Sequence, residues 1–298
     1  MSGLIGGISP HTARRTFRAA EPIHGMIYFT PYGPDAYGKV GITDQRMAYF
    51  ASRSAALGRV PAETVIATFF NFSPALVRRC IPAAWEAATP AQVLAARLDA
   101  ADRSLRQAWP DDVAGPQVRE AADLAQRAAL RAATRLQGRP LFAAHAALPW
   151  PDAPHLVLWH AQTLLREYRG DGHVALLLAE GLDGTGALIS HAATGAVSAG
   201  VLRATRGWSE EEWAAGAEGL REQGWLADGP ELALTELGQQ RRQFVEDRTD
   251  QLATYAYEAI GEDGCARLGE LTARLSAAVM AADLGFPAVL ATQYAGAS

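Results

Sequence analysis

Apolar residues recur three and four positions apart along most of the chain, and few segments alternate as strands do. This spacing is typical of amphipathic helices and predicts a mostly α fold. In the first half it predicts helices over Thr12–Phe29, Asp44–Leu57, Pro61–Phe70, Pro74–Cys80, Pro90–Ala108 and Gln117–Leu136. In the second half it predicts helices over His155–Tyr168, His173–Glu180, Gly186–Ala193, Ser198–Thr205, Glu210–Gln223, Glu236–Ile260 and Cys265–Ala282.

Several of these helices carry recognisable end signals. Ser209 and Glu212 have the S-x-x-E spacing of a capping box, and Gly224 stands where a helix C-terminal glycine belongs. Thr89 precedes Pro90, which predicts an N-cap followed by proline at the first helical position.

The segment Leu-Pro-Trp-Pro-Asp-Ala-Pro at residues 148–154 is the clearest boundary, because its three prolines cannot continue a helix. It predicts a linker between an N-terminal half, residues 1–147, and a C-terminal half, residues 155–298. The two halves share a weak similarity that places Asn71 opposite Asp183 and Thr89 opposite Ser209. This indicates two related halves, the first a degenerate winged helix, although shared Ala-rich composition also produces such matches.

A winged-helix unit is predicted in the second half. After the helix Glu210–Gln223, the turn Asp228-Gly229-Pro230 lies between two short apolar runs, which predicts a small β-hairpin wing. A long helix then opens at Thr235. The phrase LTELGQQRRQFVEDRTDQL in this helix is similar to the helix after the wing in MarR-type regulators.

Charge limits the partners that we expect. The chain has 27 Lys and Arg against 32 Asp and Glu, a net charge of −5, which disfavours binding a polyanion over the whole surface. Cys80 and Cys265 are isolated, and the N-terminus has no secretory leader, so we expect a cytoplasmic protein without a disulfide framework. The most apolar stretch contains Asp283 and Pro287, which excludes a membrane partner.

The predicted recognition helix is too acidic to favour DNA. Binding of DNA requires cations facing phosphates. The helix instead carries five glutamates against the single Arg221: Glu210, Glu211, Glu212, Glu218 and Glu222. A further helix also separates the helix that contains Ser190 from Ser209, whereas a DNA-reading motif uses a turn of about 3–4 residues. We therefore predict a scaffold, with DNA as the less favoured partner.

The stretch from His155 to His173 concentrates polar groups in apolar surroundings. His160 and Glu167 share one helix face, and His155 and Arg166 share a neighbouring one. A turn at Gly170-Asp171-Gly172 is then predicted to bring His173 close. A histidine oriented by a carboxylate can act as general acid or base, so His160, Glu167 and His173 are the predicted catalytic residues. The alternative is structural: Asp171 caps the helix at His173, and Glu167 pairs with Arg166 or Arg169.

Other polar residues complete the predicted ligand-binding set. His24 and Tyr28 lie four apart on one helix face, Asn71 is surrounded by phenylalanines, and His191 lies on an otherwise apolar helix. Once buried, these groups need partners, and a pocket between the two halves would supply them. The full ligand-binding set is His24, Tyr28, Asn71, His155, Arg166, Asp171 and His191.

No metal motif is visible, since the chain has neither an H-E-x-x-H sequence nor a CxxC pair. The sequence leaves any cofactor unknown.

The phrases EPIHGMIYF, ALPWPDAPHLVLWHAQTLLREYRGDGH, ISHAATG and RGWSEEEW resemble an actinobacterial family of two-part helix-turn-helix proteins. The resemblance covers nearly the whole chain and implies an architecture, winged-helix and distantly MarR-like, but no reaction.

Three functions are compatible with this sequence. The first is a small-molecule-binding protein, which as an enzyme of specialised metabolism would use histidine and carboxylate acid–base chemistry in a pocket between the halves. The second is a MarR-like, ligand-responsive transcriptional regulator. The third is a non-catalytic module that forms a homodimer through its terminal helices.

Overall fold

Helices form nearly all of the regular structure. The structure is a computed structural model and describes residues 7–287. The predicted mostly helical fold is confirmed. The helices are α1 (Pro10–Gly25), α2 (Tyr32–Gly38), α3 (Gln45–Ser54), α4 (Ala62–Phe69), α5 (Pro74–Cys80), α6 (Ala83–Ala87), α7 (Pro90–Ala108), α8 (Pro116–Ala132), α9 (Pro140–Ala146), α10 (Pro154–Ala179), α11 (Gly184–Ala192), α12 (Ala199–Arg206), α13 (Glu210–Glu222), α14 (Glu236–Tyr257) and α15 (Gly261–Ala281).

The predicted helix ends are confirmed where a side chain fixes them. Ser209 Oγ accepts a hydrogen bond from the N–H of Glu212, whose carboxylate accepts one from the N–H of Ser209. Thr89 and Gln92 form the same reciprocal box at the start of α7. Gly224, with φ of 75°, follows the end of α13. These ends follow from local chemistry, because each box satisfies N–H groups that the helix leaves free.

Helix α10 is continuous across Gly170–Gly172, so the predicted turn there is wrong. The physical reason is its packing against α9. The Asp171 carboxylate accepts a hydrogen bond from the N–H of Phe142, at 2.9 Å, and therefore does not cap a helix at His173. A Cβ at Gly172 would lie 2.8 Å from a guanidinium nitrogen of Arg139. Close approach of α9 thus explains a glycine that is unfavourable in an isolated helix.

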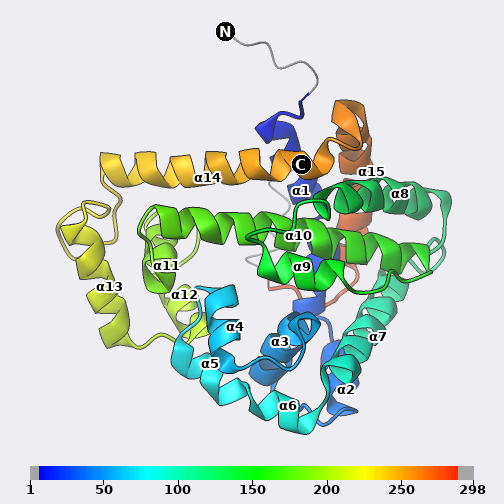
Figure 1. The fold of residues 1–298 in the computed structure, drawn as a ribbon, viewed down its shortest axis with the longest axis horizontal. Helices are drawn as coiled ribbons and strands as arrows, with labels where there is room; N and C mark the ends of the chain where they lie inside the picture. Colours follow the sequence, from blue (N-terminus) through cyan, green and yellow to red (C-terminus); the bar gives the residue numbers. More distant parts are fainter. Residues whose placement is uncertain (1–6, 288–298) are drawn as a thin grey trace.

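Helix α10 is the centre of the molecule (Figure 1). It packs against α8, α14, α1 and α9, and α15 lies against α1 and α8. Helix α14 runs across the top of the view, α11 to α13 lie on the left, and α3 to α6 lie at the bottom. The chain therefore surrounds one long helix with segments from both sides of the Pro-rich segment.

The buried apolar side chains form two clusters. The larger cluster takes residues from α1 to α9, the first part of α10, the end of α14 and α15; examples are Ile23, Phe50, Leu105, Leu158 and Leu268. The smaller cluster takes residues from the end of α10, from α11 to α13 and from α14; examples are Leu177, Ile189, Leu220, Trp225 and Val245. Helix α10 contributes to both clusters. The division into halves at residues 148–154 stays a prediction.

The predicted β-hairpin wing is not formed as two strands. Among residues 7–287, the segment after α13 has one isolated antiparallel bridge, between Leu226 and Leu234. Two backbone hydrogen bonds accompany it, from Ala227 N–H to the Ala233 carbonyl and from Thr235 N–H to the Trp225 carbonyl. Gly229 and Pro230 lie in the intervening loop, and proline has no N–H to extend the pairing.

None of the helices within residues 7–287 combines the length and apolar character needed to cross a lipid bilayer.

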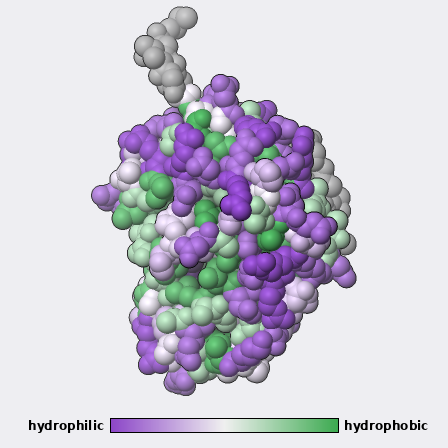
Figure 2. Space-filling view, turned by 90° about the vertical axis from the view of Figure 1, so that its right-hand side faces the viewer, coloured by the Kyte–Doolittle hydropathy of each residue, from purple (hydrophilic) through white to green (hydrophobic). Residues whose placement is uncertain are grey.

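One face of the described surface carries exposed hydrophobic residues. Figure 2 views the side on which α7 and α8 lie, and hydrophobic side chains gather near the middle of this face between hydrophilic margins. Leu98 on α7 and Leu130 on α8 are among the exposed large hydrophobic residues.

Candidate functional site

An apolar cavity of about 450 Å³ lies between α7, α9, α10 and the Pro-rich segment. Leu94 and Leu98 line it from α7, and Leu148 and Trp150 line it from the Pro-rich segment. Cavities of this size with a mainly apolar lining commonly hold small organic molecules. The cavity lies where chain segments before and after the predicted linker meet.

Arg97 brings an unneutralised positive charge to this cavity. Its side chain is on the inner face of α7, and the residue is only 2% exposed. Nη1 donates a hydrogen bond to the Ser52 carbonyl, at 2.9 Å, while Nη2 has no partner. Among residues 7–287, no carboxylate lies within ion-pair distance of Arg97. Because a buried charge without a counterion is costly, this guanidinium is an unusual feature.

Two further nitrogens beside the cavity have no partner. Trp159 Nε1 and His160 Nε2 are both buried and unpaired, and both residues line the cavity. The Trp159 ring lies 5.2 Å from the Arg97 guanidinium carbon, and the His160 ring meets Trp150 edge-on at 4.8 Å. Burial, with a contribution from the charge of Arg97, lowers the pKa of His160 to about 4. His160 is therefore neutral at pH 7.

His145 connects the cavity to the end of α3. Its Nε2 lies 3.3 Å from the Arg53 carbonyl, so this nitrogen carries the proton and donates. Burial and the charge of Arg97 lower the pKa of His145 to about 3, so this ring is also neutral at pH 7. Arg97 and His145 thus bind the consecutive carbonyls of Ser52 and Arg53.

Glu167 lies in a buried ion-pair network rather than beside His160. Its carboxylate accepts hydrogen bonds from Arg53 at 3.3 Å and from Arg166 at 3.2 Å, which confirms the Glu167–Arg166 pairing. Arg166 also donates to Glu21, at 3.2 Å. Burial alone would raise the pKa of Glu167, but the Arg53 and Arg166 guanidiniums lower it to about 2. This carboxylate is therefore unprotonated at pH 7, and it is the anionic partner of two guanidinium groups.

His24 and Tyr28 form a second buried chain next to the cavity. Thr163, which lines the cavity, donates to the Trp159 carbonyl and so accepts from His24 Nδ1, at 3.0 Å. His24 Nε2 then accepts from the Tyr28 hydroxyl, at 2.8 Å. Burial, followed by the charge of Arg166, lowers the pKa of His24 well below its usual value. The ring is neutral and both nitrogens are satisfied.

Other predicted site residues lie elsewhere. His155 lies at the start of α10 and does not line the cavity. Its Nε2 is 2.6 Å from Asp102 Oδ1 on α7. Asp171 faces α9, as described above, and burial raises its pKa to about 6. Within the described part of the chain, no three His, Cys, Asp or Glu side chains gather as possible metal ligands.

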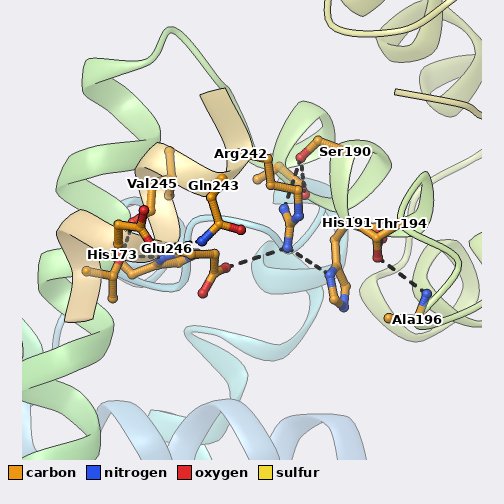
Figure 3. A network of polar contacts seen from close by, with 12 residues as sticks. His173, Ser190, His191, Thr194, Ala196, Arg242, Gln243, Val245 and Glu246 are labelled. Carbon is orange, nitrogen blue, oxygen red and sulfur yellow. Dashed lines mark hydrogen bonds and ion pairs between the residues drawn. The ribbon is translucent and has the colours of Figure 1, made fainter. Parts of the chain in front are cut away.

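His173 and His191 belong to a separate polar network between α10, α11 and α14 (Figure 3). His173 Nδ1 lies 2.9 Å from Thr249 Oγ1, and burial lowers its pKa to about 4. Arg242 on α14 donates to His191 Nδ1, at 3.0 Å, and pairs with Glu246 at 3.6 Å. The His173 contact joins α10 to α14, and the Arg242–His191 contact joins α14 to α11.

A helix-turn-helix pair is formed by α12 and α13. Three residues, Gly207, Trp208 and Ser209, join the two helices, and Gly207 has φ of 76°. The expected extra helix between the helix that contains Ser190 and Ser209 is present as α12, and it is α12, not α11, that the three-residue turn joins to α13. A short turn that contains glycine is typical of this motif.

The helix-turn-helix turn contacts the turn between α4 and α5. The Asn71 carbonyl accepts a hydrogen bond from Trp208 Nε1, at 3.0 Å, and the Ser73 N–H donates to the Arg206 carbonyl, at 2.9 Å. Asn71 thus contributes its backbone to this contact. On α13, Glu210, Glu211 and Glu212 are exposed in the first turn.

The fold and this pair of helices define a helix-turn-helix protein. A family model described as "Helix-turn-helix family" matches residues 13–286, and the chain belongs to this family. No curated protein and no solved structure matches the chain.

The sequence prediction missed Arg97, His145 and Arg53. A signal existed for Arg97, because it lies in the apolar stripe of α7 with Val93 and Ala101, four residues away on either side. A cation at such a position must find a buried partner or face a cavity.

Proposed function

We propose that this helix-turn-helix protein binds a small molecule in the cavity between α7, α9 and α10. The observation that carries the proposal is the combination of an apolar, ligand-sized cavity with three unpaired buried nitrogens, on Arg97, Trp159 and His160. Buried polar nitrogens without partners are rare in proteins. These three nitrogens are themselves almost inaccessible to solvent, so a ligand that brings acceptors reaches them once the lining side chains shift.

Binding is better supported than acid–base catalysis. The catalytic roles of His160, Glu167 and His173 stay a prediction. Glu167 pairs with Arg53 and Arg166, and His173 lies in the separate network with Thr249. Of these three residues, His160 lines the cavity, where it is suited to donate or accept a hydrogen bond.

A cavity-filling variant tests the proposal. The probe is anilinonaphthalene sulfonate, whose fluorescence rises in apolar sites. We expect saturable binding to the wild-type chain, and loss of binding in Leu98→Trp, because the larger ring enters the cavity. Leu130→Trp is the matched control, since Leu130 is exposed on the neighbouring helix α8 and does not line the cavity. Equal binding by all three proteins would contradict the proposal.

A second candidate function is that of a ligand-responsive, MarR-like transcriptional regulator. Membership of a helix-turn-helix family and the three-residue turn before α13 favour it. The exposed glutamates at the start of α13 oppose it, because they would face phosphates. Fluorescence anisotropy with the DNA upstream of the coding sequence decides between the two. Sequence-specific binding that weakens steeply with salt would establish the regulator.

We also propose that the α4–α5 and α12–α13 pairs are the related elements of the two halves. Each pair has a short turn, and the two turns contact each other through Asn71 and Trp208. We further propose that the second half is a winged-helix unit. We also propose that the chain forms a homodimer through its terminal helices. Size-exclusion chromatography with light scattering tests the dimer.

A further inference from the structure

We propose that the ligand of this cavity is an apolar monocarboxylate, with an aromatic or other flat body, whose carboxylate meets Arg97. This inference rests on the proposed function and specifies the chemical class of the ligand.

The charge of the cavity lining favours a single negative charge. Arg97 is the one Lys, Arg, Asp or Glu among the described residues that line the cavity. His145 and His160 also line it, but burial keeps both rings neutral at pH 7. The lining therefore carries one unbalanced positive charge in a low-dielectric environment. A monoanion neutralises this charge, whereas a dianion leaves an excess negative charge buried.

The donor geometry favours a carboxylate. The Ser52 carbonyl accepts one N–H of Arg97 Nη1, and both N–H groups of Nη2 are without a partner. In the cavity lining, Trp159 Nε1 and His160 Nε2 are unpaired as well, and the Trp159 ring lies next to the guanidinium. A carboxylate has two acceptor oxygens and can use Arg97 together with one of these neighbours. Hydrogen bonds to charged groups are stronger than those between neutral groups.

The apolar residues of the cavity lining favour a flat, apolar body for the ligand. Leu94, Leu98 and Leu148 supply aliphatic surface, and Trp150 and Trp159 supply flat rings. Aromatic rings pair favourably with one another in edge-on and offset arrangements. A flat apolar body therefore fits this lining better than a polar one such as a sugar.

The test compares two probes of nearly the same shape, cinnamate and cinnamamide, on the full-length protein. Quenching of tryptophan fluorescence reports binding, because Trp150 and Trp159 line the cavity. We expect the wild-type chain to bind cinnamate at least about tenfold more tightly than cinnamamide. Arg97→Met keeps an unbranched apolar chain similar to the aliphatic part of arginine and removes the charge, so we expect it to lose this preference. Arg103→Met, also on α7 but outside the cavity lining, is the control.

The preference of the wild-type chain is decisive even if Arg97→Met does not fold. Equal binding of cinnamate and cinnamamide that Leu98→Trp abolishes would overturn the monocarboxylate class and leave the proposed function intact. A cinnamate preference that persists in a folded Arg97→Met protein would overturn the assignment to Arg97. Failure of both probes, together with unchanged dye binding in Leu98→Trp, would overturn the proposed function itself.

Discussion

Glu167 and Asp171 lie one turn apart on α10, both are buried, and their surroundings shift their pKa values in opposite directions. Burial would raise both values, but Arg53 and Arg166 lower the pKa of Glu167 to about 2. Asp171 forms no ion pair among the described residues; burial raises its pKa to about 6, and the more distant charge of Arg139 offsets this only in part. Substitution by the neutral amide is therefore expected to have opposite consequences at the two positions.

Glu167→Gln is expected to destabilise the protein by about 3–5 kcal/mol at pH 7, because it leaves the Arg53 charge buried without its partner. Urea denaturation measures this change. The control is Glu63→Gln, which removes an exposed ion pair with Arg78 and is expected to change stability little, because solvent screens the pair. Similar losses at the two positions would contradict the role of the network. Because the pKa of Glu167 is lowered from 4.5, its stabilisation is present above pH 4.5 and is lost as the pH falls toward 2.

Asp171→Asn is expected to leave stability at pH 7 unchanged or to raise it by about 1–2 kcal/mol. The amide oxygen can still accept from the Phe142 N–H, and the buried charge is gone. For the wild-type aspartate, whose pKa is raised from 3.8, the favourable contribution is present below pH 3.8 and is lost as the pH rises through about 6. Denaturation curves at pH 5 and pH 8 measure this; a clear loss of stability at pH 8 would show that the charge itself holds α9.

His160→Phe is expected to reduce the loss of stability on acidification. The pKa of His160 is lowered from 6.5 to about 4, so its neutral form stabilises the fold above pH 6.5, and this is lost as the pH falls toward 4. One such histidine contributes a slope approaching about 1.4 kcal/mol per pH unit within that window. Trp150→Phe alters the same ring contact without removing a titratable group and is expected to keep the wild-type slope. Identical slopes for the two variants would exclude His160 as the source.

Gly184→Ala tests the contact between the start of α11 and the turn that joins α4 to α5. A Cβ on Gly184 would lie 2.1 Å from the Phe70 carbonyl oxygen, so one of the two backbones must move. We expect a loss of about 1–3 kcal/mol. The control is Gly200→Ala in α12, where nothing lies within 4 Å of the added Cβ and alanine is expected to stabilise by about 0.5–1 kcal/mol. Thermal unfolding of both variants is the measurement, and equal shifts would show that the contact is dispensable.

The sequence predicted those parts of the fold that depend on local chemistry. The capping boxes at Thr89 and Ser209 need residues only three positions apart. The prediction was wrong at Gly172, because a glycine that would break an isolated helix instead makes room for Arg139 of a distant segment. The expected two-stranded wing is also wrong. A single bridge between Leu226 and Leu234 closes this loop, and the two segments do not pair further.

The candidate site was predicted only in part. His160 was selected because it shares a helix face with Glu167; although Glu167 pairs with Arg53 and Arg166, His160 does line the cavity. Its neighbours there come from α7 and α9, and helical periodicity does not tell which distant helices pack together. Arg97 was overlooked, although its place between Val93 and Ala101 on the buried face of α7 was visible in the sequence.

Helix α10 has a mechanical consequence for the whole molecule. It has 26 residues and spans about 39 Å. Trp159, near its first end, lines the cavity, and Leu177, near its other end, belongs to the smaller apolar cluster. Because α10 supplies side chains to both clusters, unfolding of the whole helix would remove packing from both of them. We therefore expect the two clusters to unfold together, so that a molecule that tightens the cavity also raises the temperature at which α11 to α13 melt.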